Sequence, residues 1–229
     1  LVLCIILIAL AGGYFRAAGV FRGMEKQYEF HPDVGKQIIA LRNFLNDRYH
    51  WESESPFDKG YPYALNHLDE MALRSVANVT EMADQERAYF FNYWWSLHRS
   101  VKILRVLYGM VCLLLLYRIS TFLLSRQAAR IAALFLFAVT PVAIDVSHFA
   151  TGDIGVDLFS CLMLLFLAMY ARTEKPAWLF ITSLFVGVAF SCKYNGLFTG
   201  IAVFLFFALW GYFNRSVRKT VTGLLLIIT

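Results

Sequence analysis

The chain has 229 residues, of which 59% are hydrophobic and 16% are charged, whereas soluble globular domains have roughly 45–50% apolar and about 25% charged residues. This composition excludes a soluble globular domain, an intrinsically disordered chain and a coiled coil. The net charge of +5 at pH 7 does not indicate a nucleic-acid partner, because the basic residues stand between apolar runs and report membrane topology instead.

The apolar residues gather in runs of the kind that span membranes as helices. The first run, from Leu1 to about Tyr14, is interpreted as a clipped first span, with a signal-peptide core as the alternative. Further runs cover about residues 103–124, 131–144, 154–170, 178–192, 197–213 and 221–229. The sequence therefore predicts an all-α, polytopic transmembrane helical bundle with seven crossings. Because the chain begins without methionine and ends inside an apolar run, we expect a fragment whose first and last spans are truncated.

A long polar stretch divides the chain into three regions. We expect residues 1–20 to form the first transmembrane helix, residues 21–102 an external loop, and residues 103–229 a bundle of about six further transmembrane helices. Within the loop, apolar residues recur at helical spacing after Pro32, which predicts an amphipathic helix lying on the membrane surface. An aromatic stretch at 83–99 is typical of an interfacial belt that leads into the next span.

Lysine and arginine predict the orientation of the bundle, because positive charge in short loops stays on the cytoplasmic side. Alternate short loops carry these residues: Arg118, Arg126, Arg130, Arg172, Lys175, Arg215, Arg218 and Lys219. The intervening short loops carry only Lys193. We therefore expect the loop 21–102, the connection 141–155 and the turn 193–196 to converge on the opposite, periplasmic or luminal, face.

Acidic residues on this face are the first candidates for chemistry. Asp33, in the sequence Phe30-His31-Pro32-Asp33, lies just beyond the first span, and its alternative role is to cap a helix N-terminus. Asp153 and Asp157 are four residues apart and share a helix face. Capping explains Asp153, whereas Asp157 lies about one turn into an apolar run, where a carboxylate faces the protein interior or a watery cavity.

Basic residues on the same face predict anionic partners. Lys193 stands between two spans and departs from the positive-inside pattern, so we expect a carboxylate such as Asp153, or a bound phosphate, beside it. Arg99, Lys102 and Arg105 form a basic cluster at the mouth of the second span. Contact with lipid headgroups is the plain interpretation of that cluster.

Other chemical signatures are weak or missing in the sequence. The histidines show no metal-ligand spacing: His31, His50, His67, His98 and His148. The cysteines fall in or beside apolar runs and are predicted to be small core residues: Cys4, Cys112, Cys161 and Cys192. The sequence contains no P-loop, dinucleotide fingerprint or Gly-x-Ser-x-Gly elbow.

Three short motifs, in order along the chain, carry a resemblance to a known family. They are Phe30-His31-Pro32-Asp33 after the first span, His148-Phe149-Ala150-Thr151-Gly152-Asp153 before the fourth, and Cys192-Lys193-Tyr194-Asn195-Gly196-Leu197 between the fifth and sixth. With the long first external loop, they resemble the membrane-embedded GT-C glycosyltransferases, specifically the protein O-mannosyltransferase-like group (glycosyltransferase family 39 and its prokaryotic relatives). The resemblance covers nearly the whole chain but only about the N-terminal half of such an enzyme.

The resemblance implies an integral-membrane hexosyltransferase that moves a sugar from a polyprenyl- or dolichyl-phosphate donor to an acceptor hydroxyl. By the family's pattern, Asp33 is the catalytic carboxylate, Asp153 is the second acid, and Lys193 lies near the lipid phosphate. Arg105 is a second cation suited to that phosphate. The supporting residues are His31, His148, Asp157, Tyr194 and Asn195. Many relatives have glutamate after the first aspartate, but Val34 stands there in this chain, which argues against a paired-acid metal site.

The expected partners are the polyprenyl- or dolichyl-phosphate sugar lipid, an acceptor that is a protein, a lipid or a glycan, and the membrane, with no nucleic acid. No metal site and no cofactor are predicted, although a divalent metal stays open. The expected location is the bacterial or archaeal cytoplasmic membrane or the endoplasmic reticulum, with the active face periplasmic or luminal. Two alternatives remain: a transporter or channel that uses Asp153, Asp157 and Lys193, and a non-catalytic relative whose acids cap helices and pair with Lys193.

Overall fold

A computed structural model describes residues 2–18, 65, 68–69, 71–73, 90–148 and 151–214 of the chain. Its elements are α1 (Val2–Ala17), α5 (Phe90–Leu123), α6 (Gln127–Val139), α7 (Pro141–His148), α8 (Asp153–Thr173), α9 (Pro176–Cys192), the 3-10 turn η2 (Tyr194–Gly196) and α10 (Leu197–Asn214). This described part contains no strand, and its long helices coincide with the apolar runs. The structure therefore confirms the predicted all-α membrane bundle. The predicted surface helix after Pro32 and the run from 221 lie outside the described residues.

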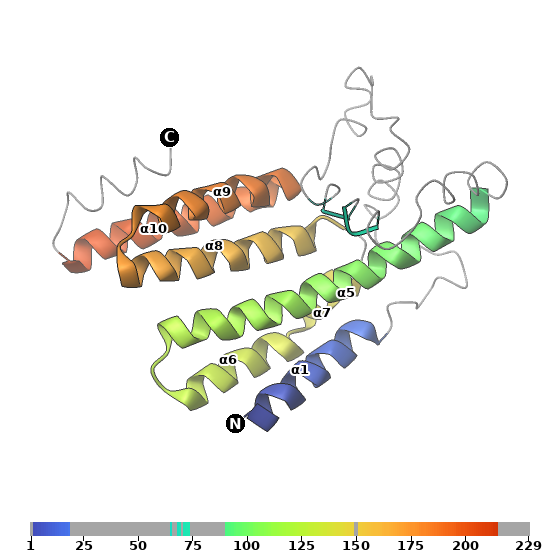
Figure 1. The fold of residues 1–229 in the computed structure, drawn as a ribbon, viewed down its shortest axis with the longest axis horizontal. Coiled ribbons are helices and arrows are strands. Elements are labelled where there is room, and N and C mark those ends of the chain that lie inside the picture. The colour runs from blue at the N-terminus through green and yellow to red at the C-terminus, as the bar shows by residue number, and fades with distance from the viewer. Residues whose placement is uncertain are drawn as a thin grey trace, which may run out of the picture.

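The helices run back and forth, so that their termini meet at two opposite ends of the bundle (Figure 1). Helices α8, α9 and α10 lie side by side, and α8 also packs against α5, which in turn contacts α1, α6 and α7. One end, here called the carboxylate end, carries Asp69, Asp153 and Lys193. The other, the basic end, carries Arg118, Arg126, Arg130, Arg172 and Lys175.

Apolar and small side chains pack the helices together. One core cluster joins α5, α8 and α9 and contains Tyr108, Cys112, Ile154, Leu158, Cys161 and Cys192. The prediction of core cysteines is confirmed for three of the four, which are buried in this cluster. It is wrong for Cys4, which is exposed because only one side of α1 packs against α5, α6 and α7.

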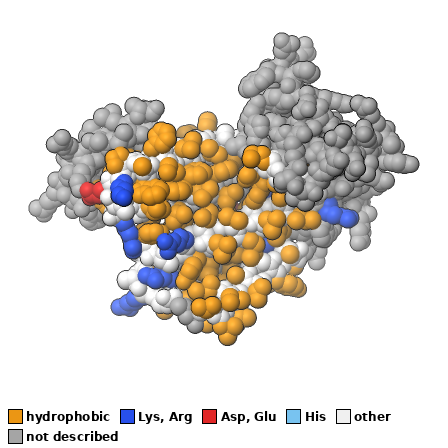
Figure 2. Space-filling model, viewed as in Figure 1, with side chains coloured by type: hydrophobic (Ala, Val, Ile, Leu, Met, Phe, Trp, Pro, Cys, Tyr) orange, Lys and Arg blue, Asp and Glu red, His pale blue; other side chains and the backbone are white. Residues whose placement is uncertain are grey.

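The surface of the bundle is apolar, as expected for a protein embedded in lipid. Figure 2 shows hydrophobic side chains over most of the described face, with lysine and arginine mainly toward the basic end. Leu97–Leu123 and Asp153–Thr173 are long and apolar enough to cross a membrane, and the bent pair Gln127–Val139 and Pro141–His148 is a third candidate if it counts as one span. Helices α1, α9 and α10 supply shorter apolar segments. The chain is a membrane protein, and the seven crossings stay a prediction.

The run predicted as one span at 131–144 is broken in the structure. Helix α6 ends at Val139, Thr140 is extended, and α7 begins at Pro141 with a bend of 49° between the two helices. Proline has no backbone N–H and disfavours a helical conformation in the residue before it, so a helix ends or bends there. Hydropathy is continuous across Pro141, which is why the apolar run alone does not predict the break.

A tight connection between α8 and α9 brings the carboxylate end together. Helix α8 is closed by Glu174, whose φ of 50° is left-handed, and its N–H bonds to the Tyr170 carbonyl. Helix α9 starts at once with Pro176, which suits the first turn of a helix. The two helices therefore run antiparallel in contact, so the start of α8 and the end of α9 lie at the same end of the bundle.

Candidate functional site

Two predicted site residues meet at the carboxylate end. The Nζ atom of Lys193 donates to both carboxylate oxygens of Asp153, at 2.8 and 2.9 Å. The Lys193 side chain is 12% exposed and the Asp153 side chain is 28% exposed. Of the two anionic partners expected for Lys193, the structure thus shows the carboxylate, and both side chains remain reachable from outside the bundle.

The backbone at two helix ends positions this pair. Asp153 is the first residue of α8, where the positive end of the helix dipole stabilises a carboxylate. Lys193 follows the last residue of α9 in an extended conformation, and its carbonyl accepts a 2.8 Å hydrogen bond from the N–H of Gly196. Gly196 lies directly on the backbone of Ala189 and Phe190, which leaves no room for a side chain. Glycine at this turn therefore fixes the place of Lys193.

Asp157 lies one turn beyond Asp153 on α8 and is half-buried. Its charge interacts with those of Asp153 and of Arg16, near the end of α1. A carboxylate within an apolar span needs such compensation, because an isolated charge in a membrane is costly. Arg16 therefore supplies positive charge that the sequence analysis does not assign to this end of the bundle.

A second ion pair lies at the same end and was not anticipated from the sequence. The guanidinium of Arg105 donates two 2.6 Å hydrogen bonds to Asp69, and the Tyr108 hydroxyl donates a third to it at 3.0 Å. Both charged side chains are fully buried. The headgroup interpretation is therefore wrong for Arg105, because a carboxylate from the chain's own polar segment covers it. Lys102 is also buried, whereas Arg99 is exposed.

The two ion pairs share one apolar support. Tyr108, which bonds to Asp69, belongs to the same core cluster as Ile154, the residue after Asp153. Leu65 joins that cluster and lies against Gly155, where an added Cβ would meet both of its methyl groups at 3.1 and 3.2 Å. The segment that carries Leu65 and Asp69 is thus packed against α5 and α8 beside the Lys193–Asp153 pair.

Three further predicted residues lie around this end without joining that pair. His148, the last residue of α7, donates from Nε2 to the Phe15 carbonyl at 3.0 Å and so connects α7 to α1. Tyr194 is exposed, and Asn195 beside it in η2 is half-buried. Among the predicted site residues that the structure describes, Asp153 and Lys193 are the two that it brings into direct contact as an ion pair.

The predicted catalytic carboxylate, Asp33, and its neighbour His31 lie outside the described residues. Their roles stay predictions. Within the described ranges, no group of three or more His, Cys, Asp or Glu side chains gathers as the ligands of a metal ion would.

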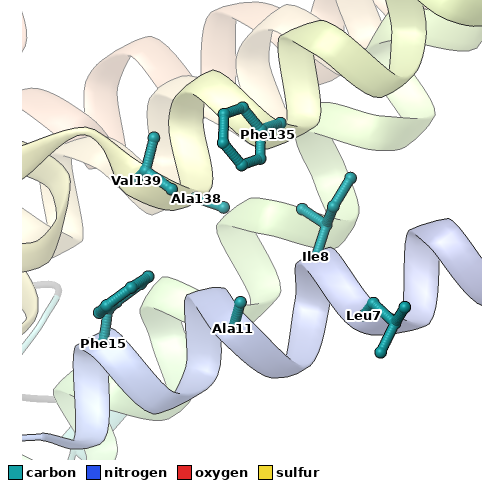
Figure 3. Close-up of a pocket in the computed structure, with 7 residues that line it drawn as sticks. All are labelled: Leu7, Ile8, Ala11, Phe15, Phe135, Ala138 and Val139. Atoms are coloured by element: carbon teal, nitrogen blue, oxygen red, sulfur yellow. The ribbon is translucent and has the colours of Figure 1, made fainter.

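A separate groove lies between α1 and α6 (Figure 3). It has a volume of about 250 Å³, and its lining is apolar: Leu7, Ile8, Ala11, Phe15, Phe135, Ala138 and Val139. A lining without polar side chains offers nothing that would orient a sugar or a phosphate. We therefore place the candidate site at the carboxylate end and not in this groove.

Comparison with known proteins adds one finding. Residues 94–229, more than half of the chain, match the family described as dolichyl-phosphate-mannose-protein mannosyltransferase. The matched region contains Arg105, Asp153 and Lys193. No curated protein and no solved structure matches the chain.

Proposed function

The chain belongs to the dolichyl-phosphate-mannose-protein mannosyltransferase family and is a membrane glycosyltransferase, and from this premise we propose the reaction that it carries out. It transfers a sugar from a polyprenyl- or dolichyl-phosphate donor to an acceptor hydroxyl at the carboxylate end of the bundle. The observation that supports this most is the Lys193–Asp153 pair, in which a cation and an acid, both partly exposed, stand at the end of apolar helices. A lipid phosphate anchored in the bilayer would lie at that level.

The proposed chemistry is a single displacement at the anomeric carbon. The acceptor oxygen attacks this carbon while the bond from the carbon to the donor phosphate oxygen breaks, and the bonding electron pair leaves with the phosphate. The acceptor proton passes to a carboxylate, for which we propose Asp33. A general base in this position contributes roughly a hundred- to ten-thousand-fold to the rate. The donor arrives laterally through the bilayer, so the reaction needs no nucleotide site.

Lys193 is the proposed partner of the leaving phosphate. The phosphate gains negative charge as the bond breaks, and a fixed cation in a water-poor site stabilises that charge. Asp153 accepts hydrogen bonds from the Lys193 ammonium with both carboxylate oxygens and so holds it in place, and it is the proposed second acid. Arg105 is the second proposed cation, but its two hydrogen bonds to Asp69 must open before it can bind a phosphate.

The remaining proposals concern orientation and surroundings. We propose that the carboxylate end faces the periplasm or the lumen, since the short loops at the other end carry more lysine and arginine than the short turn at Lys193. His31, His148, Asp157, Tyr194 and Asn195 are the proposed supporting residues. The acceptor is a hydroxyl of a protein, a lipid or a glycan.

The test is sugar transfer from a polyprenyl-phosphate donor in membranes that contain the full-length protein. We expect Asp33→Asn to reduce kcat by about a hundredfold or more, because the general base is lost. Lys193→Gln should reduce kcat/KM for the donor by about tenfold or more, because the leaving phosphate loses its cation. The matched controls are Asp145→Asn and Lys175→Gln, which change exposed residues and should leave transfer unaltered.

Two results would count against the proposal. Unchanged transfer by Asp33→Asn at equal protein level would reduce Asp33 to a helix cap. Absence of transfer by the wild-type protein with every donor tried would favour the transporter or the non-catalytic relative instead.

A further inference from the structure

Arg16 lies in the last turn of α1 and is fully buried. Its Nη1 atom donates to the Ala138 carbonyl at 3.1 Å, and its Nη2 atom donates to the Phe137 carbonyl at 3.3 Å. The guanidinium carbon is 5.3 Å from the centre of the Phe137 ring. An arginine of one apolar helix thus directs its donors to the backbone of the last turn of another helix, α6.

Because α6 ends at the break, the carbonyls of Phe137 and Ala138 have no backbone N–H of a following helical turn to bond to. In an unbroken helix the carbonyl of residue 137 accepts from the N–H of residue 141, and that of residue 138 from the N–H of residue 142. Pro141 has no N–H, and Thr140 is extended with ψ of 119°, which turns the following residues away from α6. A backbone carbonyl without a partner is costly inside a membrane. Arg16 supplies the missing donors.

The packing around Arg16 makes room for this side chain. A Cβ atom at Gly109 of α5 would lie 3.0 Å from both Cδ and Nε of Arg16 and 2.6 Å from Oγ of Ser147. A Cβ atom at Gly12 of α1 would lie 3.3 Å from Nη1 of Arg16. The negative charge of Asp157 on α8 offsets part of the cost of burying a positive charge here. Residues of three helices therefore accommodate one guanidinium.

A matching contact lies on the other side of the break. His148, at the end of α7, donates to the carbonyl of Phe15, the residue before Arg16, at 3.0 Å. The last turn of α1 thus bonds to α6 before the break and to α7 after it. We propose that Arg16 is a positioning residue: it caps the break between α6 and α7 and, with His148, fixes the direction of α7 toward the segment that carries Asp153. The consequence for sugar transfer rests on the proposed function.

The test combines thermal unfolding and sugar transfer of the full-length protein. Arg16→Met removes the donors and keeps an apolar side chain of similar reach, and Arg126→Met at an exposed position is the matched control. We expect Arg16→Met to lower the melting temperature by about 4 °C or more and Arg126→Met to leave it unchanged. In a Pro141→Ala background, residue 141 regains its N–H and can serve the Phe137 carbonyl. In the Pro141→Ala background, Arg16→Met should therefore lower the melting temperature by about half as much as it does in the wild-type background.

The kinetic readout separates positioning from stability alone. Arg16→Met should raise the donor KM by about tenfold, because a shift of Asp153 also displaces the Lys193 ammonium that it holds. Loss of folded protein alone would lower kcat and leave the donor KM unchanged. Arg16→Lys keeps a cation that can donate to one of the two carbonyls. Its melting temperature and its kinetic constants should therefore lie between those of the wild type and of Arg16→Met. This variant replaces Arg16→Met in the test if Arg16→Met does not accumulate.

Each half of the proposal has its own refuting outcome. Equal melting losses from Arg16→Met with and without the Pro141→Ala substitution would overturn the capping, and an unchanged donor KM in folded Arg16→Met would overturn the positioning. If the wild-type protein transfers no sugar, the proposed function fails, whereas the melting comparison still decides whether Arg16 caps the break.

Discussion

At the scale of single residues, a charge inside this bundle is tolerated where a second charge and a neutral donor surround it. Arg105 and Asp69 are fully buried, and the Asp69 carboxylate accepts hydrogen bonds from Arg105 and from Tyr108. Desolvating two charges offsets most of their attraction, so such a pair contributes little net stability compared with apolar residues of the same size. Removing one partner is different, because the other charge is then buried alone. The pair therefore determines where the polar segment docks.

This asymmetry gives a prediction for the Asp69–Arg105 pair. Asp69→Asn should destabilise the protein by about 3–5 kcal/mol, because it leaves the Arg105 charge without its counter-charge. The double variant Asp69→Leu with Arg105→Leu should recover most of that loss, since no charge is then buried. Thermal unfolding of the full-length protein in detergent measures both, with Asp145→Asn as an exposed control. A double variant no more stable than Asp69→Asn would show that the two side chains do not act as a pair.

At the scale of elements, the turn η2 decides where Lys193 lies. Its Gly196 packs on the backbone of Ala189 in α9, and its carbonyl accepts a 2.6 Å hydrogen bond from Thr199 of α10. Because the first contact involves backbone atoms, no side chain can rotate away to admit a larger residue. The turn must shift as a whole, and Lys193 shifts with it.

Gly196→Ala should therefore destabilise the protein by about 1–3 kcal/mol and reduce transfer as Lys193 is displaced from Asp153. Gly187, in the middle of α9, faces open space, with no atom within 4 Å of an added Cβ, so Gly187→Ala is the matched control. It should leave stability unchanged or raise it by about 0.5–1 kcal/mol, because alanine favours the helix. Thermal unfolding measures the change in stability, and the transfer assay measures the change in activity. Equal effects of Gly196→Ala and Gly187→Ala on both would contradict the role assigned to the turn.

The same elements show how far the sequence alone leads. Long apolar runs predict most of the helices, because a span must satisfy its backbone internally and present apolar side chains to lipid. The Lys193–Asp153 pair was also accessible from the sequence, since a lysine on the wrong side of the charge pattern demands an anion. The role of Asp69 could not be predicted from the sequence, because it stands 36 residues from Arg105 in a polar segment and has no local pattern around it. Arg16 was equally hidden, since its partners are backbone carbonyls.

At the scale of the whole molecule, the two ends of the bundle differ in charge and in construction. At the basic end, Arg172 donates to the carbonyls of Thr121 and Phe122 at the end of α5, at 3.3 and 2.9 Å. Arg118 and Arg172 each place their guanidinium carbon 4.9 Å from the centre of the Phe122 ring. These arginines therefore join helices as well as marking a membrane side. The carboxylate end instead holds Lys193 and Arg105 in ion pairs with Asp153 and Asp69, and this is the end where we place the chemistry.

The last prediction concerns which way this bundle faces. Helix α9 is 17 residues long, about 25 Å at 1.5 Å per residue, which is shorter than a bilayer core of about 30 Å. Local thinning of the bilayer accommodates such a short span, so we expect its two ends to emerge on opposite sides. In a Cys4→Ser background, which removes the exposed native thiol, Tyr194→Cys should react with a membrane-impermeant maleimide added to the periplasmic or luminal side of sealed membranes. Ala177→Cys, exposed at the other end of α9, should react only after the membrane is opened. The reverse pattern would invert the orientation, and reaction of both thiols from one side would mean that α9 does not cross.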